Sequence, residues 1–276
     1  MTLADKTALV TGATDGVGKL IAQALAQAGA RVLIHGRNAE RGAAVLASLG
    51  GAPHDFLRAD LASLAEVRGL AAEVLARTDR LDILINNAGV GSTSRGVSGR
   101  ETSRDGHELR FAVNYLAPFL LTHLLLPTIR KSAPARIVNV SSAGQHAIDF
   151  DDVMLTRGYD GVRAYCQSKL AQILFTVELA QRLAGTGVTV TALHPATYMN
   201  TTMVRTAGHT PISKVEDGAD AVLNLAVAPA LAGRTGLYFN RKQEARADPQ
   251  AYDAHARAAL WALSLELTGL PQTATA

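Results

Sequence analysis

Short apolar runs alternate along the chain with longer segments in which apolar residues recur every three or four positions. The short runs are rich in Val, Ile and Leu and end in turn residues, which is typical of buried β-strands. The longer segments have the periodicity of helices that bury one face. The pattern predicts strands at 7–12, 31–36, 54–60, 81–89, 136–142, 188–195 and 236–241, and helices at 17–29, 40–50, 64–77 and 169–185.

This repeated strand-helix order predicts an α/β fold. Strands that are apolar throughout and joined by helices are typical of a mainly parallel sheet with helices on both faces. No internal repeat or shift in composition marks a second domain, so residues 1–276 are expected to form a single doubly wound Rossmann-type domain.

Irregular segments follow several strands at their carboxyl ends, the edge where open α/β sheets bind ligands. They cover residues 91–103, 145–162 and 197–214. We expect 197–214 to form a substrate loop or lid, and about 249–270 to form a C-terminal helical extension. In that extension Trp261 lies on an apolar stripe, which suits core packing, with a subunit contact or pocket wall as the alternative.

A glycine-rich turn, TGATDGVG at 11–18, joins the first strand to the first helix. Gly12 permits a tight turn, Gly16 lets the backbone approach a phosphate, and Gly18 allows close packing of helix and strand. The free N–H groups of a helix N-terminus bind anions. This context favours a dinucleotide site over a plain structural loop.

The end of the second strand bears on which dinucleotide binds. An acidic residue there bonds the ribose hydroxyls of NAD, but this chain has Gly36 followed by Arg37. A guanidinium pairs with a 2′-phosphate, so NADP(H) is preferred and NAD(H) remains possible. Asp15 in the glycine turn argues the other way, and a solvated Arg37 is the alternative.

Tyr165 and Lys169 lie four residues apart in AYCQSK. On a helix they share a face, and a charge about 5 Å from the phenol at an effective dielectric of about 20 lowers its pKa by about two units. We therefore expect a tyrosine that exchanges protons near neutrality. The alternative is a surface tyrosine beside a solvated lysine.

Composition narrows the classes of function. Lys and Arg number 27 against 24 Asp and Glu, without a basic run that suits nucleic acid. The one cysteine, Cys166, excludes an internal disulfide, and the eight histidines lack metal-site spacing. Without a secretion signal, and with polar or Pro residues interrupting the apolar stretch 111–129, the chain is expected to be cytoplasmic, with no membrane, nucleic-acid or metal partner.

These motifs together resemble the short-chain dehydrogenase/reductase family over nearly the whole chain. The resemblance rests on TGATDGVG, NNAG at 86–89, Asn114, VNVSS at 138–142 and YCQSK at 165–169. Residues 164–195 are most similar to the retinol-dehydrogenase-like branch. The family pattern implies the strand order 3-2-1-4-5-6-7. Ala196 departs from the glycine usual after the sixth strand.

The resemblance implies a catalytic tetrad of Asn114, Ser142, Tyr165 and Lys169. Tyr165 is then the general acid/base, Lys169 lowers its pKa and bonds the nicotinamide ribose, and Asn114 holds a water that links Lys169 to solvent. Ser141 and Ser142 point to opposite faces, and their pattern alone does not choose between them. The family motif implies that Ser142 contacts the substrate oxygen.

The cofactor contacts carried over from the family extend the glycine turn. They are Gly12, Thr14, Asp15, Gly16, Val17, Gly18, Arg37, Asn38, Asp60, Leu61, Asn87, Ala88, Gly89, Tyr165, Lys169, Pro195 and Thr197. Cys166 and His194 are expected to pack, with a second base as the alternative for His194. DFDDV at 149–153 is expected to be solvated surface, with substrate contact as the alternative.

We therefore expect an enzyme that moves hydride between NADP(H) and a ketone, aldehyde or alcohol. The lid side chains Tyr198, Met199, Met203 and Val204 suggest a medium-sized, partly apolar substrate. The family resemblance implies a homo-oligomer. The alternatives are a non-catalytic NADP-sensing regulator and, on the same scaffold, a sugar-nucleotide epimerase or dehydratase.

Overall fold

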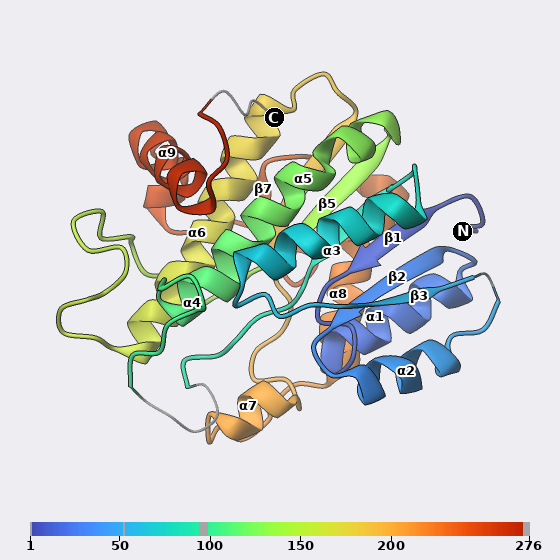
Figure 1. The fold of residues 1–276 in the computed structure, drawn as a ribbon, viewed down its shortest axis with the longest axis horizontal. Coiled ribbons are helices and arrows are strands. Elements are labelled where there is room, and N and C mark those ends of the chain that lie inside the picture. The colour runs from blue at the N-terminus through green and yellow to red at the C-terminus, as the bar shows by residue number, and fades with distance from the viewer. Residues whose placement is uncertain (1, 52, 94–98, 273–276) are drawn as a thin grey trace.

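The computed structural model describes residues 2–51, 53–93 and 99–272, and within them the sheet has eight strands (Figure 1). Their spatial order is β3-β2-β1-β4-β5-β6-β7-β8, parallel from β3 to β7. The strands are β1 (Thr7–Val10), β2 (Arg31–Gly36), β3 (Asp55–Arg58), β4 (Ile83–Asn86), β5 (Ala135–Val140), β6 (Val188–His194), β7 (Leu237–Asn240) and β8 (Gln243–Ala245). The doubly wound fold and the order of the seven predicted strands are confirmed.

Helices lie between the parallel strands and after the last strand. They are α1 (Gly16–Gln27), α2 (Ala39–Ser48), α3 (Leu64–Arg77), α4 (Leu109–Phe111), α5 (Ala117–Lys131), α6 (Gly161–Arg182), α7 (Thr202–Thr206), α8 (Val215–Val227) and α9 (Ala254–Thr268). A π-helical turn, η1 (Ala112–Leu116), joins α4 to α5, and 3-10 turns cover Pro229–Leu231 and Pro249–Tyr252. Asp15, Asn38, Ser63 and Asp160 cap α1, α2, α3 and α6 through side-chain oxygens, which fixes where these helices begin.

Two layers of apolar side chains hold the helices against the sheet. Successive strand residues point to opposite faces, so Leu9 packs with α3, α5 and α6 while Ala8 and Val10 pack with α1 and α8. In Figure 1, α3, α5, α6 and α9 gather on one side of the molecule and α1, α2 and α8 on the other. This arrangement leaves the carboxyl ends of the parallel strands free for a site.

The expected strand count of seven is too low by one. β8 pairs antiparallel with β7 through a tight turn in which Arg241 has φ of 56°. The segment Gln243–Ala245 has no buried residue, so no apolar pattern marks it as a strand.

The long apolar stretch forms one continuous helical unit, Leu109–Lys131, rather than a regular α-helix. By length and composition it could cross a membrane, yet 83% of its most apolar window is buried inside the fold. Its backbone widens into the π-helical turn η1, which contains Asn114. Such turns often occur at functional sites, because they redirect a side chain without ending the helix.

Two further segments cover residues 197–214, predicted to be a lid, and residues 249–270, predicted to be a C-terminal extension. Residues 197–214 follow β6 and contain only the short helix α7. The extension forms α9, which packs on α6 through a buried face that includes Leu260 and Trp261. The Trp261 ring lies 5.4 Å from Phe119 and 6.1 Å from Phe175, centroid to centroid, so the core-packing interpretation holds for this residue.

Candidate active site

The glycine turn after β1 has the geometry that its spacing predicts. Gly12 and Gly16 have φ of 65° and 51°, a backbone conformation that side chains disfavour. A Cβ atom built on Gly18 would lie 2.2 Å from Gly12 O, so only glycine lets α1 approach the turn this closely. Thr14, Asp15 and Val17 complete the turn at the start of α1.

Residues 87–89, after β4, connect the glycine turn to the catalytic candidates. Asn87 Nδ2 donates to Thr11 O at 2.9 Å and to Gly12 O at 3.2 Å. Ala88 packs on Gly12, where a built Cβ would lie 2.8 Å from Ala88 Cα. A Cβ atom on Gly89 would lie 3.1 Å from Asn114 Oδ1 and 3.5 Å from Lys169 Nζ. This short segment therefore brings the two halves of the site together.

The carboxyl end of β2 has no room for an acidic side chain. A Cβ atom on Gly36 would lie 2.4 Å from Thr14 Cγ2, so a larger residue would collide with the glycine turn. Arg37 is mostly exposed, with its Nη1 atom 3.8 Å from Asp60 Oδ1. Asn38 uses its Oδ1 to accept from Arg41 N at 2.8 Å, which caps α2.

Arg41, which the sequence analysis missed, adds a second guanidinium beside Arg37. Its Nη1 atom lies 3.6 Å from Asp15 Oδ2. The ion pair offsets the negative charge that argued against a 2′-phosphate here. The signal in the sequence was the spacing of four residues between Arg37 and Arg41 across the start of a helix.

Lys169 ends inside the protein, with 4% of its surface exposed. Its Nζ atom donates to Val140 O at 2.8 Å and to Gln172 Oε1 at 3.0 Å. It lies 5.9 Å from the centroid of the Tyr165 ring, so one side of α6 presents both groups.

Asn114 is fully buried and makes three hydrogen bonds. Its Oδ1 accepts from Val90 N at 2.7 Å, and its Nδ2 donates to Val90 O at 3.1 Å and Ser168 Oγ at 2.9 Å. These contacts tie the loop after β4 to α6 beside Lys169. Asn114 is thus a hydrogen-bonded polar residue inside an apolar helix, and it also lies against the catalytic candidate Lys169.

The two serines after β5 have different surroundings. Ser141 Oγ donates to Lys169 O at 2.7 Å and anchors the backbone of α6. Ser142 Oγ accepts from Gly144 N at 3.0 Å and is hydrogen-bonded to the Tyr165 hydroxyl. The geometry separates the alternatives that the pattern left open, since Ser142 is the serine that meets the phenol.

The sequence predicts a lowered pKa for Tyr165, and this prediction is wrong because the pKa is raised. Burial raises the pKa of Tyr165, and the hydrogen bond with Ser142 opposes this only in part. Burial also lowers the pKa of Lys169 to about 7. The sequence argument placed a full positive charge beside a hydrated phenol, whereas here desolvation penalises both charged forms.

The remaining predicted contacts line the same edge of the sheet. Asp60 accepts from Ala62 N through Oδ1 at 3.1 Å, and Leu61 is buried, so its side chain packs in the core. Pro195 and Thr197 follow β6, and Thr197 Oγ1 lies 3.0 Å from His194 Nε2. His194 therefore orients the strand end, in keeping with the packing role expected of it.

His35, on β2, is another residue that the sequence analysis missed. Its Nδ1 accepts from Gly12 N at 3.3 Å and its Nε2 contacts Ala59 O at 3.1 Å. Burial lowers the pKa of His35 to about 4, so the ring is neutral at pH 7. Because Nδ1 must accept, the proton resides on Nε2, and the ring braces the glycine turn against the end of β3.

The segment 145–160 lies between Ser142 and α6 and is tied to the C-terminal part of the chain. Gln250 bonds both backbone groups of Ile148, at 2.6 Å and 3.0 Å. Gln145 Oε1 accepts from Asp248 N at 2.7 Å. Within DFDDV, Asp149 pairs with Arg163 at 3.1 Å and Val153 is buried, so the segment is only partly the solvated surface expected of it.

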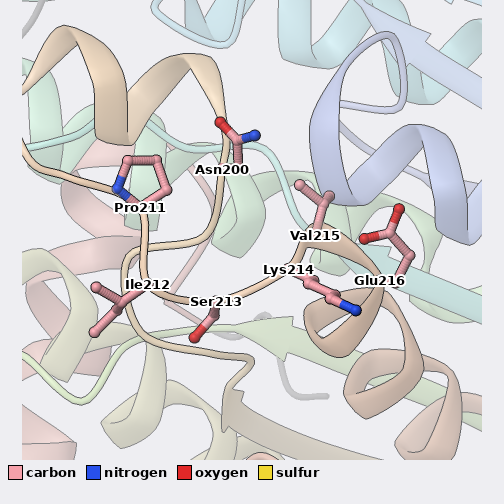
Figure 2. Close-up of a pocket in the computed structure, with 7 residues that line it drawn as sticks. All are labelled: Asn200, Pro211, Ile212, Ser213, Lys214, Val215 and Glu216. Atoms are coloured by element: carbon pink, nitrogen blue, oxygen red, sulfur yellow. The ribbon is translucent and has the colours of Figure 1, made fainter.

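The lid crosses the front of the glycine turn. Thr202 Oγ1 donates to Asp15 Oδ2 at 2.8 Å, and Met203 packs against Gly91. Met199 packs on Gly218 of α8 rather than into the cleft. A cavity of about 430 Å³ lies between Asn200 and residues 211–216, on a part of the lid that excludes the four catalytic candidates (Figure 2).

The fold and the glycine turn define a class of protein, the Rossmann-type oxidoreductases, and Asn114, Ser142, Tyr165 and Lys169 lie together near the carboxyl ends of β4 and β5. Comparison with known proteins agrees with it. Residues 6–211 match the family model described as short chain dehydrogenase. The chain belongs to the short-chain dehydrogenase family, whose enzymes use a nicotinamide cofactor.

Individual relatives cover almost the whole chain. Human retinol dehydrogenase 13 is 40% identical over 98% of this chain and 86% of its own length. Among solved structures, an uncharacterized protein from Mycobacterium paratuberculosis has a TM-score of 0.80 and 31% identity, over 98% of this chain and 95% of the other. The Pseudomonas aeruginosa RhlG/NADP active-site complex has a TM-score of 0.68 and 31% identity, over 87% and 95%. The resemblance identified from the sequence is confirmed.

Proposed function

We propose that this protein is an NADP(H)-dependent oxidoreductase that interconverts an alcohol and the corresponding ketone or aldehyde. One observation carries the proposal. Ser142 and Lys169 both lie close to Tyr165 near the carboxyl ends of the strands, and Gly89, which follows β4, lies against Lys169 and Asn114.

The residues present fit a dinucleotide. Gly12, Gly16 and Gly18 form a cradle without side chains at the N-terminus of α1, which suits a pyrophosphate. Among the described residues, Arg37 and Arg41 make long ion pairs, at 3.8 and 3.6 Å, so both guanidinium groups are available to a 2′-phosphate. When bound, the cofactor supplies or accepts the hydride.

The chain's own groups handle the proton and the substrate oxygen. In reduction Tyr165 donates its phenolic proton to the carbonyl oxygen, and in oxidation it accepts the proton of the alcohol. Ser142 donates a hydrogen bond to the same oxygen and stabilises the charge that develops there. Lys169 provides the nearby ammonium and a donor for the cofactor ribose, and Asn114 fixes the loop that borders it.

The substrate is proposed to be of medium size and partly apolar. Tyr198, Met203 and Val204 belong to the lid, and both Tyr198 and Met203 expose apolar surface. Met203 packs beside Gly91, on the loop that leads from the cofactor cleft. Met199 is removed from this set because it packs on α8. The similarity to retinol dehydrogenase 13 adds a retinoid to the compounds worth testing.

The test is a panel of ketones, aldehydes, quinones and retinal, each assayed by NADPH and NADH oxidation at 340 nm. We expect turnover of at least one partly apolar carbonyl compound, with a higher kcat/KM for NADPH than for NADH. Tight NADPH binding by fluorescence without turnover across the panel would instead favour the regulator alternative. Faster turnover with NADH throughout would contradict the cofactor assignment.

Replacement of Arg37 tests the cofactor assignment residue by residue. In Arg37→Ala we expect kcat/KM for NADPH to fall by about 10- to 100-fold, since a hydrogen bond to a charged group contributes about 1.5–3 kcal/mol. The value for NADH should change little, because NADH lacks the 2′-phosphate. Arg77→Ala is the control, as Arg77 pairs with Asp55 at the opposite end of β3. Equal losses with both cofactors in Arg37→Ala would show that Arg37 does not read the phosphate.

A further inference from the structure

Gln172 lies one turn beyond Lys169 on α6 and is 1% exposed. Its Oε1 atom accepts from Lys169 Nζ at 3.0 Å, while Val140 O accepts a second N–H of the ammonium at 2.8 Å. An ammonium has three donors, so these two contacts fix the direction of the lysine and leave one donor for a ligand. Gln172 therefore helps to set where the ammonium stands.

The orientation of the Gln172 amide has only one sensible assignment. Its Nε2 atom is buried and has no hydrogen-bond partner among the residues that the structure describes. Turning the amide over would place its NH₂ group against the ammonium, two donors facing each other. Gln172 Nε2 is thus a buried donor without a partner among the described residues, while Oε1 of the same amide accepts from Lys169. A leucine would pack at this position without that cost, so packing does not explain the glutamine.

The electrostatic surroundings of Lys169 make this oxygen important. On α6 the titratable neighbour of the ammonium is Tyr165, and Cys166 and, on β7, Tyr238 lie near that phenol rather than near the lysine. The segment after β5 and the turn η1 contribute Ser142 and Asn114, which are uncharged. Across residues 2–51, 53–93 and 99–272, burial is what lowers the pKa of Lys169, and no carboxylate offsets it.

We propose that Gln172 is a positioning residue whose amide oxygen holds the Lys169 ammonium in place and favours its charged form. The proposal rests on the proposed function, because it assumes that the lysine acts on Tyr165. Gln172 itself touches neither the phenol nor the predicted substrate position.

Loss of the Gln172 Oε1 atom should lower the pKa of Lys169. Without Oε1 the ammonium loses an acceptor, so the pKa of Lys169 falls below its value of about 7. Alcohol oxidation needs an ionised Tyr165 beside a charged Lys169, and that state becomes harder to populate. The maximal rate of oxidation therefore falls, and the acidic limb of its pH profile moves to lower pH together with the lysine titration. A hydrogen bond to a charged group corresponds to a shift of about one to two pH units.

The experiment compares Gln172→Leu with Gln167→Leu in the pH dependence of kcat/KM for alcohol oxidation. Gln167 is equally buried on α6, but its Nε2 donates to Val153 O at 2.8 Å and it does not contact Lys169. We expect the maximal rate to fall by about 10-fold and the acidic limb to shift downward by about one unit or more in Gln172→Leu, and both to stay in place in Gln167→Leu. Gln172→Met keeps the length of the side chain with a weaker acceptor, and it is the variant to measure if Gln172→Leu does not fold.

A second readout does not depend on turnover. In protein labelled with ¹³C-lysine, the Lys169 Cε resonance, assigned by its loss in Lys169→Met, should titrate at lower pH in Gln172→Leu than in the unmodified protein. An active enzyme whose acidic limb and lysine titration are the same in Gln172→Leu overturns the role of Gln172 and leaves the proposed function intact. A lowered lysine titration in a protein without turnover on any carbonyl or alcohol supports the contact and overturns the function.

Discussion

Tyr165→Phe is expected to bind NADPH as the unmodified protein does and to lose turnover by about 10²-fold or more. The substitution removes only the hydroxyl that meets Ser142, and it leaves Lys169 and its contacts with Val140 and Gln172 in place. Binding is measured by NADPH fluorescence and turnover by NADPH oxidation with the best carbonyl substrate of the panel.

Tyr159→Phe is the matched control. Tyr159 precedes α6 and its hydroxyl donates to Glu108 Oε1 at 3.1 Å, away from the four candidates. Its loss should leave turnover within a few-fold of the unmodified protein. Equal activity in Tyr165→Phe would remove the proposed proton donor and, with it, the mechanism.

The raised pKa of Tyr165 also sets the pH dependence of the unmodified enzyme. A phenol whose pKa lies above its ordinary value stays protonated throughout the neutral range, so the proton donor for reduction is present there in full. The rate of reduction is thus limited by loss of the phenolic proton only in alkaline solution. Oxidation needs the ionised phenol beside the charged Lys169, so its rate should increase with pH only up to the titration of Lys169, at about pH 7.

The sequence was sufficient for those parts of the molecule that depend on local chemistry. Gly12 and Gly18 occupy the positions that their spacing predicts, because a tight turn and a close helix approach exclude side chains. The seven predicted strands are present, and most of them are runs of buried residues. Tyr165 and Lys169 share one side of α6 because residues four apart on a helix do so.

The parts that could not be predicted depend on contacts between distant segments. The three residues of β8 carry no apolar pattern and pair only because the turn at Arg241 folds them onto β7. Met199 belongs to the lid in sequence, but α8 covers it. The direction of the Tyr165 pKa shift was wrong because burial is decided by the whole fold, whereas the spacing of two residues reports only their distance.

Gln172 is another residue whose contacts the sequence did not predict. In the sequence it is one polar residue within an apolar helical segment, KLAQILFTVELAQ, and its spacing from Lys169 suggests no chemistry. Only the structure places its amide oxygen on the ammonium and leaves its nitrogen unpaired. The unpaired amide nitrogen of Gln172 therefore indicates a role that no short sequence motif indicates.

Lys169→Met is expected to lose kcat/KM by about 10³-fold while the protein remains at least as stable at pH 7. The activity falls because both the charge beside Tyr165 and the donor for the cofactor ribose are removed, so NADPH binding should weaken as well, in contrast to Tyr165→Phe. The variant should stay stable because burial lowers the pKa of Lys169 from 10.5 to about 7 in the unmodified protein. A base whose folded pKa is depressed opposes folding in full below about pH 7, and that penalty disappears as the pH rises to 10.5.

An apolar side chain of similar length removes this penalty, although Val140 O and Gln172 Oε1 lose their donor. Urea unfolding at pH 7 and at pH 10 separates the two contributions. The free energy of unfolding of Lys169→Met, relative to the unmodified protein, should be more favourable at pH 7 than at pH 10. Lys19→Met, on α1, is the control and should show no such difference. A variant that keeps its activity would mean that the ammonium is not a catalytic charge. A variant whose relative stability is the same at both pH values would mean that the ammonium is not desolvated.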